Sequence, residues 1–84
     1  MEIKIIKDKN ITDFISWLIW KCEPSKFDWK YDSEEHCYII KGRVTVVGLK
    51  NTVNIKPGDY VIFPKGLKCT WIVQEAIKKY YTFK

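Results

Sequence analysis

A carboxylate and two thiols are the side chains of this sequence best suited to chemistry. Glu35 and Cys37 lie two residues apart in a predicted strand over residues 35–41, and the two-residue repeat of a strand places them on the same face. Cys69 lies in another predicted strand, over residues 67–73. A carboxylate beside a thiol can act as general base for a nucleophile, so Glu35 and Cys69 are the candidate catalytic residues. The alternative, that each cysteine is a small buried hydrophobic residue, stays open.

The same three side chains are the best metal ligands that the sequence offers. Glu35, Cys37 and Cys69 with one water molecule would suit zinc. The cysteines do not form a Cys-x-x-Cys pair, so we expect no metal or other cofactor and keep a divalent ion at these residues as an alternative. His36, the one histidine, follows Glu35 directly and is therefore expected on the opposite face of the strand.

Aromatic side chains are placed to line a cavity beside these residues. Phe27, Trp29 and Tyr31 alternate with charged residues, which is typical of a half-buried strand. Trp71 lies two residues after Cys69, on the same face. Such aromatics either fill a core or stack against a small planar or apolar ligand, and we predict a ligand pocket. Its predicted residues are Trp29, Tyr31, Glu35, Cys37, Cys69 and Trp71.

The elements that position these residues are short strands separated by turns. Seven to nine strands are predicted, with turns at Pro-Gly-Asp (residues 57–59) and Pro-x-Gly (residues 64–66). Asn10 or Thr12 is expected to cap a short helix that covers one end of the molecule. We therefore predict an all-β barrel with a short N-terminal helix. It forms one domain over residues 1–84, with the N-terminal strand and helix in about residues 1–18 and the barrel in about residues 19–84.

Two pairs of neighbouring strands are predicted around the candidate residues. Gly42 is expected to turn the chain between a strand over residues 35–41 and one over residues 43–47. Near the C-terminus, separate strands are predicted over residues 67–73 and 77–83.

The composition predicts a small cytoplasmic protein with diffuse positive charge. Its 84 residues include four Trp, five Tyr and four Phe, and aromatics build a core from few residues. The net charge is +5, but the lysines are scattered and Arg43 is the one arginine, so no nucleic-acid partner is expected. The apolar stretches are far shorter than the about 20 residues that cross a bilayer. Three cysteines cannot all pair within the chain, which favours a reducing cytoplasm and no membrane partner.

Two motifs resemble those of the cupin family. In the second cupin motif a glycine, five residues, Pro-x-Gly and two further residues precede a metal-binding histidine, and Gly58, Pro64 and Gly66 match in identity and spacing. Cys69 occupies the position of the histidine. The resemblance implies a jelly-roll-type β-barrel of the RmlC-like superfamily. In typical members three imidazoles and a carboxylate hold a metal ion.

The first cupin motif is matched only in its second half. Glu35 stands seven residues before Gly42, as in the family. With a three-residue spacer the two histidine positions of the motif fall at Trp29 and Tyr31. A four-residue spacer moves each position back by one residue and again gives no histidine. The resemblance therefore implies a cupin without its metal-binding histidines.

Longer stretches resemble one subgroup of small stand-alone cupins. Phe-x-Trp-x-Tyr-Asp, Glu-x-Cys-Tyr-Ile and Lys-Gly-Leu-Lys-Cys-Thr-Trp are similar to a subgroup placed with the cupin domain of (S)-ureidoglycine aminohydrolase and with ethanolamine-utilisation cupins. The resemblance implies a cupin of unassigned activity. From the residues we predict a pocket that binds a small molecule, and from the small size of the domain a homodimer, because a small domain can gain stability by dimerising. One alternative is a metal-dependent enzyme of nitrogen-compound metabolism. Another is a non-catalytic module that senses a ligand or dimerises, with outward aromatics such as Tyr38 and Tyr60 at the interface.

Overall fold

The computed structural model describes residues 2–84, and most of their regular structure is β-strand. Seven strands form one antiparallel sheet in the order β1-β6-β4-β7-β2, with β3 paired to β7 and β5 paired to β4. This confirms the all-β class. The strands are β1 (Lys4–Ile6), β2 (Leu18–Cys22), β3 (Ser25–Lys30), β4 (Glu35–Val47), β5 (Thr52–Ile55), β6 (Tyr60–Phe63) and β7 (Lys68–Phe83).

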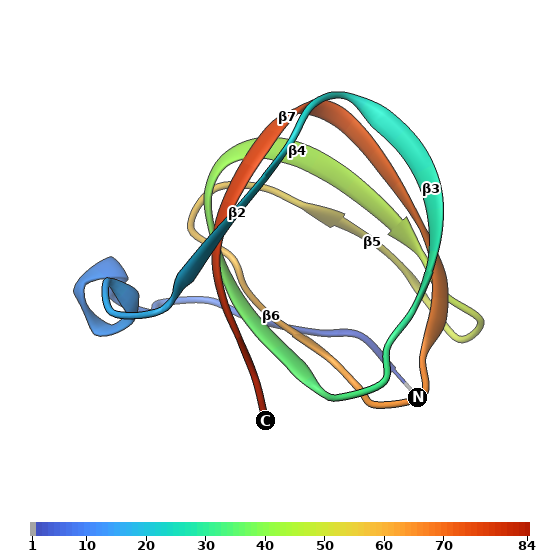
Figure 1. Cartoon of the computed structure of the whole chain (residues 1–84), viewed down its shortest axis with the longest axis horizontal. Coiled ribbons are helices and arrows are strands. Elements are labelled where there is room, and N and C mark those ends of the chain that lie inside the picture. The colour runs from blue at the N-terminus through green and yellow to red at the C-terminus, as the bar shows by residue number, and fades with distance from the viewer. Residues whose placement is uncertain (1) are drawn as a thin grey trace.

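Two long strands, β4 and β7, form the centre of the sheet. They pair over most of their lengths, from Glu35 opposite Phe83 to Val47 opposite Thr70. On its other edge, each long strand pairs with two short strands. β7 pairs with β2 and β3, and β4 pairs with β6 and β5. The sheet curls strongly, so that one face looks inward and the other outward (Figure 1). The inward face carries the candidate residues.

An irregularity at Gly42 lets β4 continue where the sequence predicts a turn between two strands. The register with β7 shifts between Ile39 and Val44, and Gly42 has a φ of 97°. On the inward face of β4, the buried side chains are odd-numbered up to Ile39 and even-numbered from Val44 onward. This is the behaviour of a β-bulge, which bends a strand and shifts its facing. β7 likewise continues without the predicted break, because Arg43 pairs with Glu75 opposite the bulge.

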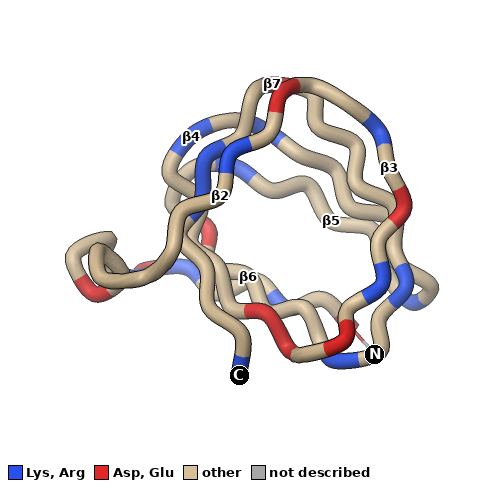
Figure 2. Tube along the Cα trace, in the orientation of Figure 1, with Lys and Arg blue, Asp and Glu red and all other residues tan. Residues whose placement is uncertain are grey.

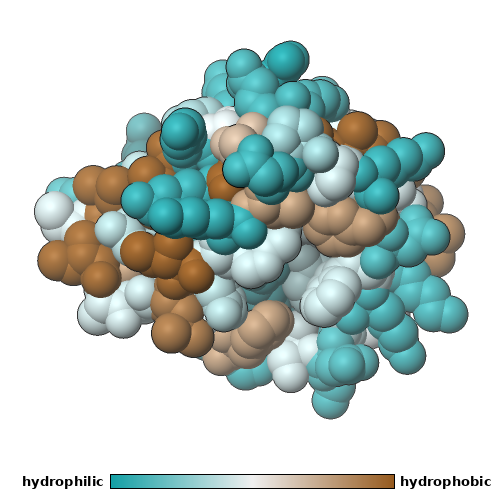
Figure 3. Space-filling view, turned by 45° about the horizontal axis from the view of Figure 1, so that its top comes forward, coloured by the Kyte–Doolittle hydropathy of each residue, from teal (hydrophilic) through white to brown (hydrophobic). Residues whose placement is uncertain are grey.

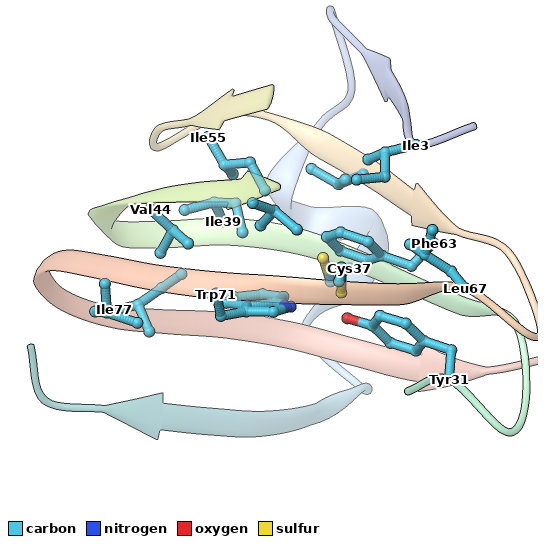
Figure 4. Packing of buried hydrophobic residues seen from close by; sticks show 14 residues of the cluster. Ile3, Tyr31, Cys37, Ile39, Val44, Ile55, Phe63, Leu67, Trp71 and Ile77 are labelled. Carbon is cyan, nitrogen blue, oxygen red and sulfur yellow. The ribbon is translucent and has the colours of Figure 1, made fainter. Parts of the chain in front are cut away.

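The core lies inside the curl of the sheet. Figure 4 shows its side chains pointing from facing strands into a shared interior. The ring centroid of Phe63 lies 5.0 Å from that of Tyr31 and 5.4 Å from that of Trp71. Tyr31 and Trp71 are each only 2% exposed. Large aromatic rings therefore occupy much of this interior, as expected for a core built from few residues.

Where a short N-terminal helix is predicted, the structure has one turn of 3-10 helix, η1 (Ile11–Phe14). Asn10 caps this turn as predicted, since its side chain accepts a hydrogen bond of 3.0 Å from the Thr12 amide. The chain is already extended again at Leu18, which leaves no room for further helical turns. Phe14 is buried on the outer face of the sheet, so the turn does not cover an end of the molecule as predicted.

Phe14 and its neighbour Trp17 cover part of the outer face of β4 and β6. The ring of Phe14 lies 5.0 Å from that of Tyr38 and 5.3 Å from that of Tyr60, between centroids. Trp17 lies 6.1 Å from Tyr60 by the same measure. The two tyrosines are only 9% and 8% exposed. They are packed within their own chain, which corrects their expected place at a dimer interface.

The Pro-Gly-Asp turn between β5 and β6 is confirmed. The Asp59 amide donates to the Lys56 carbonyl at 3.2 Å, and Gly58 has the positive φ, 92°, of a type II turn. The buried Asp59 carboxylate accepts a hydrogen bond of 3.1 Å from the Lys56 amide and forms an ion pair with Lys7. The ion pair therefore links this turn to Lys7, in the segment that follows β1.

Charged residues are spread over the molecule. Figure 2 shows Lys and Arg positions on several strands, with Asp and Glu positions among them. Within residues 2–84, no helix is long and apolar enough to span a membrane.

A methyl group at Gly42 should destabilise the fold far more than one at Gly58. Both glycines have positive φ, 97° and 92°, so an alanine at either position costs about 1–2 kcal/mol. At Gly42 the added carbon would also lie 2.3 Å from the Ala76 carbonyl oxygen, whereas nothing lies within 4 Å at Gly58. Urea unfolding should therefore show Gly42→Ala to be about 2 kcal/mol less stable than Gly58→Ala. Equal losses would contradict the close approach of β4 and β7 at the bulge.

Candidate functional site

An aromatic pocket opens on the inward face between β2, β3, β4 and β7. Its volume is about 270 Å³. Glu35 and Lys79 contribute the charged side chains of its lining, and all other lining residues are aromatic. Trp29 and Phe83 are half-exposed and form part of its rim. The aromatic residues are Trp20, Phe27, Trp29, Tyr31, Trp71, Tyr81 and Phe83.

Glu35 and Lys79 form a buried ion pair at the floor of this pocket. Lys79 Nζ lies 2.7 Å from Glu35 Oε2, and the two side chains are 6% and 4% exposed, respectively. The other carboxylate oxygen, Oε1, accepts a hydrogen bond of 2.8 Å from the Tyr31 hydroxyl. Each oxygen of the carboxylate therefore has a hydrogen-bond donor. Buried charges require this kind of pairing and hydrogen bonding, because each is costly to remove from water alone.

Two indole rings complete the surroundings of the Lys79 ammonium. Its Nζ lies 4.5 Å from the ring centroid of Trp71 and 4.9 Å from that of Trp20, within the range of cation–π attraction. Lys79 is not among the site residues predicted from the sequence. Its position on β7 shares the inward parity of Ile77 and Tyr81, and a lysine on a buried face is almost always paired. This shared inward parity is the sequence feature that could have identified Lys79 as a site residue.

Tyr31 keeps its proton in this network. Burial raises the pKa of its hydroxyl, and the neighbouring Glu35 carboxylate raises that pKa further. The hydroxyl therefore serves as a hydrogen-bond donor to Glu35. The backbone of Tyr31 is held against the Pro-x-Gly turn, because its amide donates to the Leu67 carbonyl at 2.9 Å and its carbonyl accepts from the Gly66 amide at 2.7 Å.

The two candidate thiols lie in different surroundings. Cys37 is wholly buried in the core, and burial raises the pKa of its thiol to about 12. Cys69 is 7% exposed and lies opposite Trp29, beside a second, open hollow. Burial also raises the pKa of Cys69, an effect that the Trp71 indole opposes and Glu35 reinforces. Both thiols are therefore protonated at neutral pH, which is not the state of an activated nucleophile.

The structure brings four of the six predicted pocket residues to the aromatic pocket: Trp29, Tyr31, Glu35 and Trp71. Phe27, on β3, stacks on Trp71 with ring planes 11° apart. The indole nitrogen of Trp71 is the one buried side-chain nitrogen or oxygen in residues 2–84 without a hydrogen-bond partner of ordinary geometry. Figure 4 shows this nitrogen and the Tyr31 oxygen directed toward the same part of the interior. The polar atoms of both aromatics thus face inward.

His36 lies on the face of β4 opposite to Glu35, as predicted. Its Nδ1 is 2.6 Å from the Tyr60 hydroxyl oxygen, and its Nε2 is 2.6 Å from a carboxylate oxygen of Glu34. The histidine therefore connects groups on the outer face and takes no part in the pocket.

The residues present do not fit the metal centre of typical cupins. In the part of the chain that the structure describes, no three side chains of His, Cys, Asp or Glu lie together so that they could hold a metal ion. Glu35 already uses both oxygens on Tyr31 and Lys79. Lys79 supplies the positive charge beside Glu35 that a metal ion would otherwise supply.

Comparison with known proteins shows the family. The family model described as the EutQ-like cupin domain matches residues 11–81. The chain belongs to the EutQ-like cupin family. This confirms its resemblance to small cupins of the RmlC-like superfamily. Comparison with curated proteins gives no match.

Several solved structures are similar to this cupin. A DUF861 family protein from Thermotoga maritima is 41% identical, with a TM-score of 0.91 over 99% of this chain and 100% of that chain. The Clostridium difficile EutQ protein is 19% identical, with a TM-score of 0.71 over 96% of this chain and 66% of that chain. A putative ethanolamine utilization protein Q from Salmonella typhimurium is 18% identical, with a TM-score of 0.71 over 96% and 68%. The last two likenesses show a shared fold.

Removing one charge of the Glu35–Lys79 ion pair should destabilise this cupin more than removing both charges. Glu35→Gln leaves the buried Lys79 ammonium without its counter-charge, and Lys79→Met leaves the carboxylate without one. Each change should lower the free energy of unfolding by about 3–5 kcal/mol. The double variant carries no charge there and should be more stable than either single variant. Urea unfolding of the four proteins measures this coupling, and strictly additive losses would contradict a direct interaction.

Proposed function

We propose that this cupin binds a small, flat and mostly apolar molecule in its aromatic pocket, without a metal ion. The observation that carries this proposal is the set of aromatic rings above the mutually neutralised Glu35–Lys79 pair. The rings supply stacking surface for a planar ligand. The pair and the Tyr31 hydroxyl supply the few polar groups that a small-molecule site uses for orientation.

The dimensions of the pocket support a ligand of one or two rings. Its volume of about 270 Å³ lies below the about 300–1,000 Å³ of typical drug-sized sites. Trp29 and Phe83 are 50% and 51% exposed at the rim, whereas Tyr31 and Trp71 are buried deeper in the lining. A ligand that enters past the rim would therefore meet aromatic surface first and the polar floor last.

We extend the proposal to the architecture and setting of the protein. The curl of the sheet around its core supports a closed jelly-roll-type barrel, as the cupin family implies. Three free thiols, Cys22, Cys37 and Cys69, support a reducing, cytoplasmic setting. A metal-dependent enzyme similar to (S)-ureidoglycine aminohydrolase is less well supported, because the donor set around Glu35 does not fit a metal ion.

As a second proposal, two copies of this cupin associate through an apolar patch at η1 and the start of β2. The residues of the patch are between 40% and 66% exposed, and Figure 3 shows apolar side chains gathered on this side of the molecule, at the left. Exposed apolar patches on small proteins mark contact surfaces. β2 is also the last strand in the order of the sheet, and such edges favour pairing. The patch comprises Ile11, Ile15 and Ile19.

Removing a rim aromatic should weaken ligand binding without unfolding the protein. Indole is a suitable probe, because it is flat, uncharged and small, and the indole N–H resonances of Trp20 and Trp71 report on its binding by NMR. Trp29→Ala removes one stacking partner that is 50% exposed, and should raise the dissociation constant about tenfold. Leu49→Ala changes a residue that is 89% exposed and lies outside both the pocket lining and the patch, and as the control it should leave binding unchanged. Equal affinities in Trp29→Ala and the parent protein would contradict the proposed site.

A charge in the apolar patch should abolish the proposed dimer. Light scattering should give the parent protein twice the 10.0 kDa mass of one chain. Ile19→Lys places an unpaired charge at the patch and should give the mass of a single chain, because a buried charge without a partner is costly. Leu49→Lys changes an apolar residue that is 89% exposed outside the patch and should leave the mass unchanged. A single-chain mass for the parent protein would refute the dimer.

A further inference from the structure

We propose that the aromatic pocket selects uncharged planar molecules that carry a hydrogen-bond acceptor, and that it discriminates against carboxylates and amines alike. This inference rests on the proposed function, since it names the class of ligand that the same pocket takes. It follows from the charge at the floor, from the hydrogen-bonding groups left over there and from the size of the cavity.

The charges that line the pocket cancel one another. Glu35 and Lys79 are its charged residues, and they pair at 2.7 Å. The tyrosines of the lining, Tyr31 and Tyr81, are uncharged when protonated, and the remaining lining residues carry no ionisable group. An incoming carboxylate or ammonium would lose water without gaining a free counter-ion. Burial of an unpaired charge is strongly unfavourable, so a neutral ligand is favoured over an ion of either sign.

At the floor of the pocket, hydrogen-bond donors outnumber the acceptors. A carboxylate only accepts, and both oxygens of Glu35 already do so, from Tyr31 and from Lys79. An ammonium has three N–H donors, and the Lys79 ammonium directs one to Glu35 while its other contacts are the ring faces of Trp20 and Trp71. A carbonyl oxygen on the ligand would make a stronger bond with such a donor than an aromatic face does. The floor therefore suits an acceptor such as an amide or ketone.

The cavity limits the body of the ligand. Its volume of about 270 Å³ suits a single ring with a small substituent or two fused rings, because a site must also leave clearance around the ligand. The rings of Phe27 and Trp71 stack on each other, with planes 11° apart, so a ligand would stack against the flat ring faces that this pair leaves free. A planar molecule uses such walls better than a branched one, because offset stacking needs parallel faces.

Three probes that differ in charge and share one ring test this inference. Benzamide is neutral, benzoate is an anion and benzylamine is a cation near neutral pH. Their dissociation constants can be measured from the indole N–H resonances of the parent protein, with indole as the reference ligand of the pocket. We expect benzamide to bind at least about tenfold more tightly than either charged probe.

Two variants extend the test, because each leaves one charge of the pair unopposed. Glu35→Gln leaves Lys79 and should shift the preference toward benzoate, whereas Lys79→Met leaves Glu35 and should shift it toward benzylamine. Each shift should be at least about tenfold relative to benzamide. Preferences that stay unchanged in both folded variants would overturn the inference. Should a variant not fold, the three probes on the parent protein decide alone.

The outcomes separate this inference from the proposed function. If indole binds while benzoate or benzylamine binds as tightly as benzamide, the inference is overturned and the pocket remains. If indole and all three probes fail to shift the resonances of Trp20 and Trp71, the proposed function fails, and the inference fails with it. Tighter binding of benzamide, with opposite shifts in the two variants, supports both.

Discussion

The buried pair of Glu35 and Lys79 is the interaction on which the candidate site depends. Its members come from the two central strands, β4 and β7, whose pairing brings their inward-facing side chains together. Neither charge is stable alone inside the sheet. The Tyr31 hydroxyl and the indole rings of Trp20 and Trp71 are therefore its supporting contacts as well as the surface of the pocket. The same contacts give an aromatic cavity a polar but electrically balanced floor.

The pair also accounts for the way this cupin departs from the metal-binding pattern of its fold. Glu35 keeps its expected spacing before the glycine of the first motif, but aromatic residues and Cys69 occupy the histidine positions. The Lys79 ammonium, 2.7 Å from the carboxylate, balances its charge without further ligands. Unlike a metal ion, a lysine ammonium is attached to the protein through its own side chain and needs no set of ligands around it. Aromatic rings can therefore pack directly beside it. Aromatic side chains thus surround the Glu35–Lys79 pair in a chain that lacks the histidines of the metal-binding motif.

The parts of the fold set by local backbone chemistry could be predicted from the sequence, and those set by distant contacts could not. The turn at Gly58 was predictable because a positive φ there suits glycine, and the inward position of Glu35 followed from strand alternation. The continuation of β4 through Gly42 depends on pairing with β7, which the local sequence does not reveal. Lys79 lies 44 residues from Glu35. The N-terminal turn is short because Phe14 packs on the sheet, and such tertiary contacts override helix propensity.

A crystal structure of the protein grown with excess Mn²⁺, with anomalous diffraction data, tests the central claim most directly. The account predicts Lys79 Nζ at hydrogen-bond distance from Glu35 Oε2, as at the 2.7 Å observed here, with the Tyr31 hydroxyl on the other oxygen. It predicts no anomalous peak at that carboxylate. A manganese peak coordinated by Glu35, with the Lys79 ammonium turned away from the carboxylate, would contradict it.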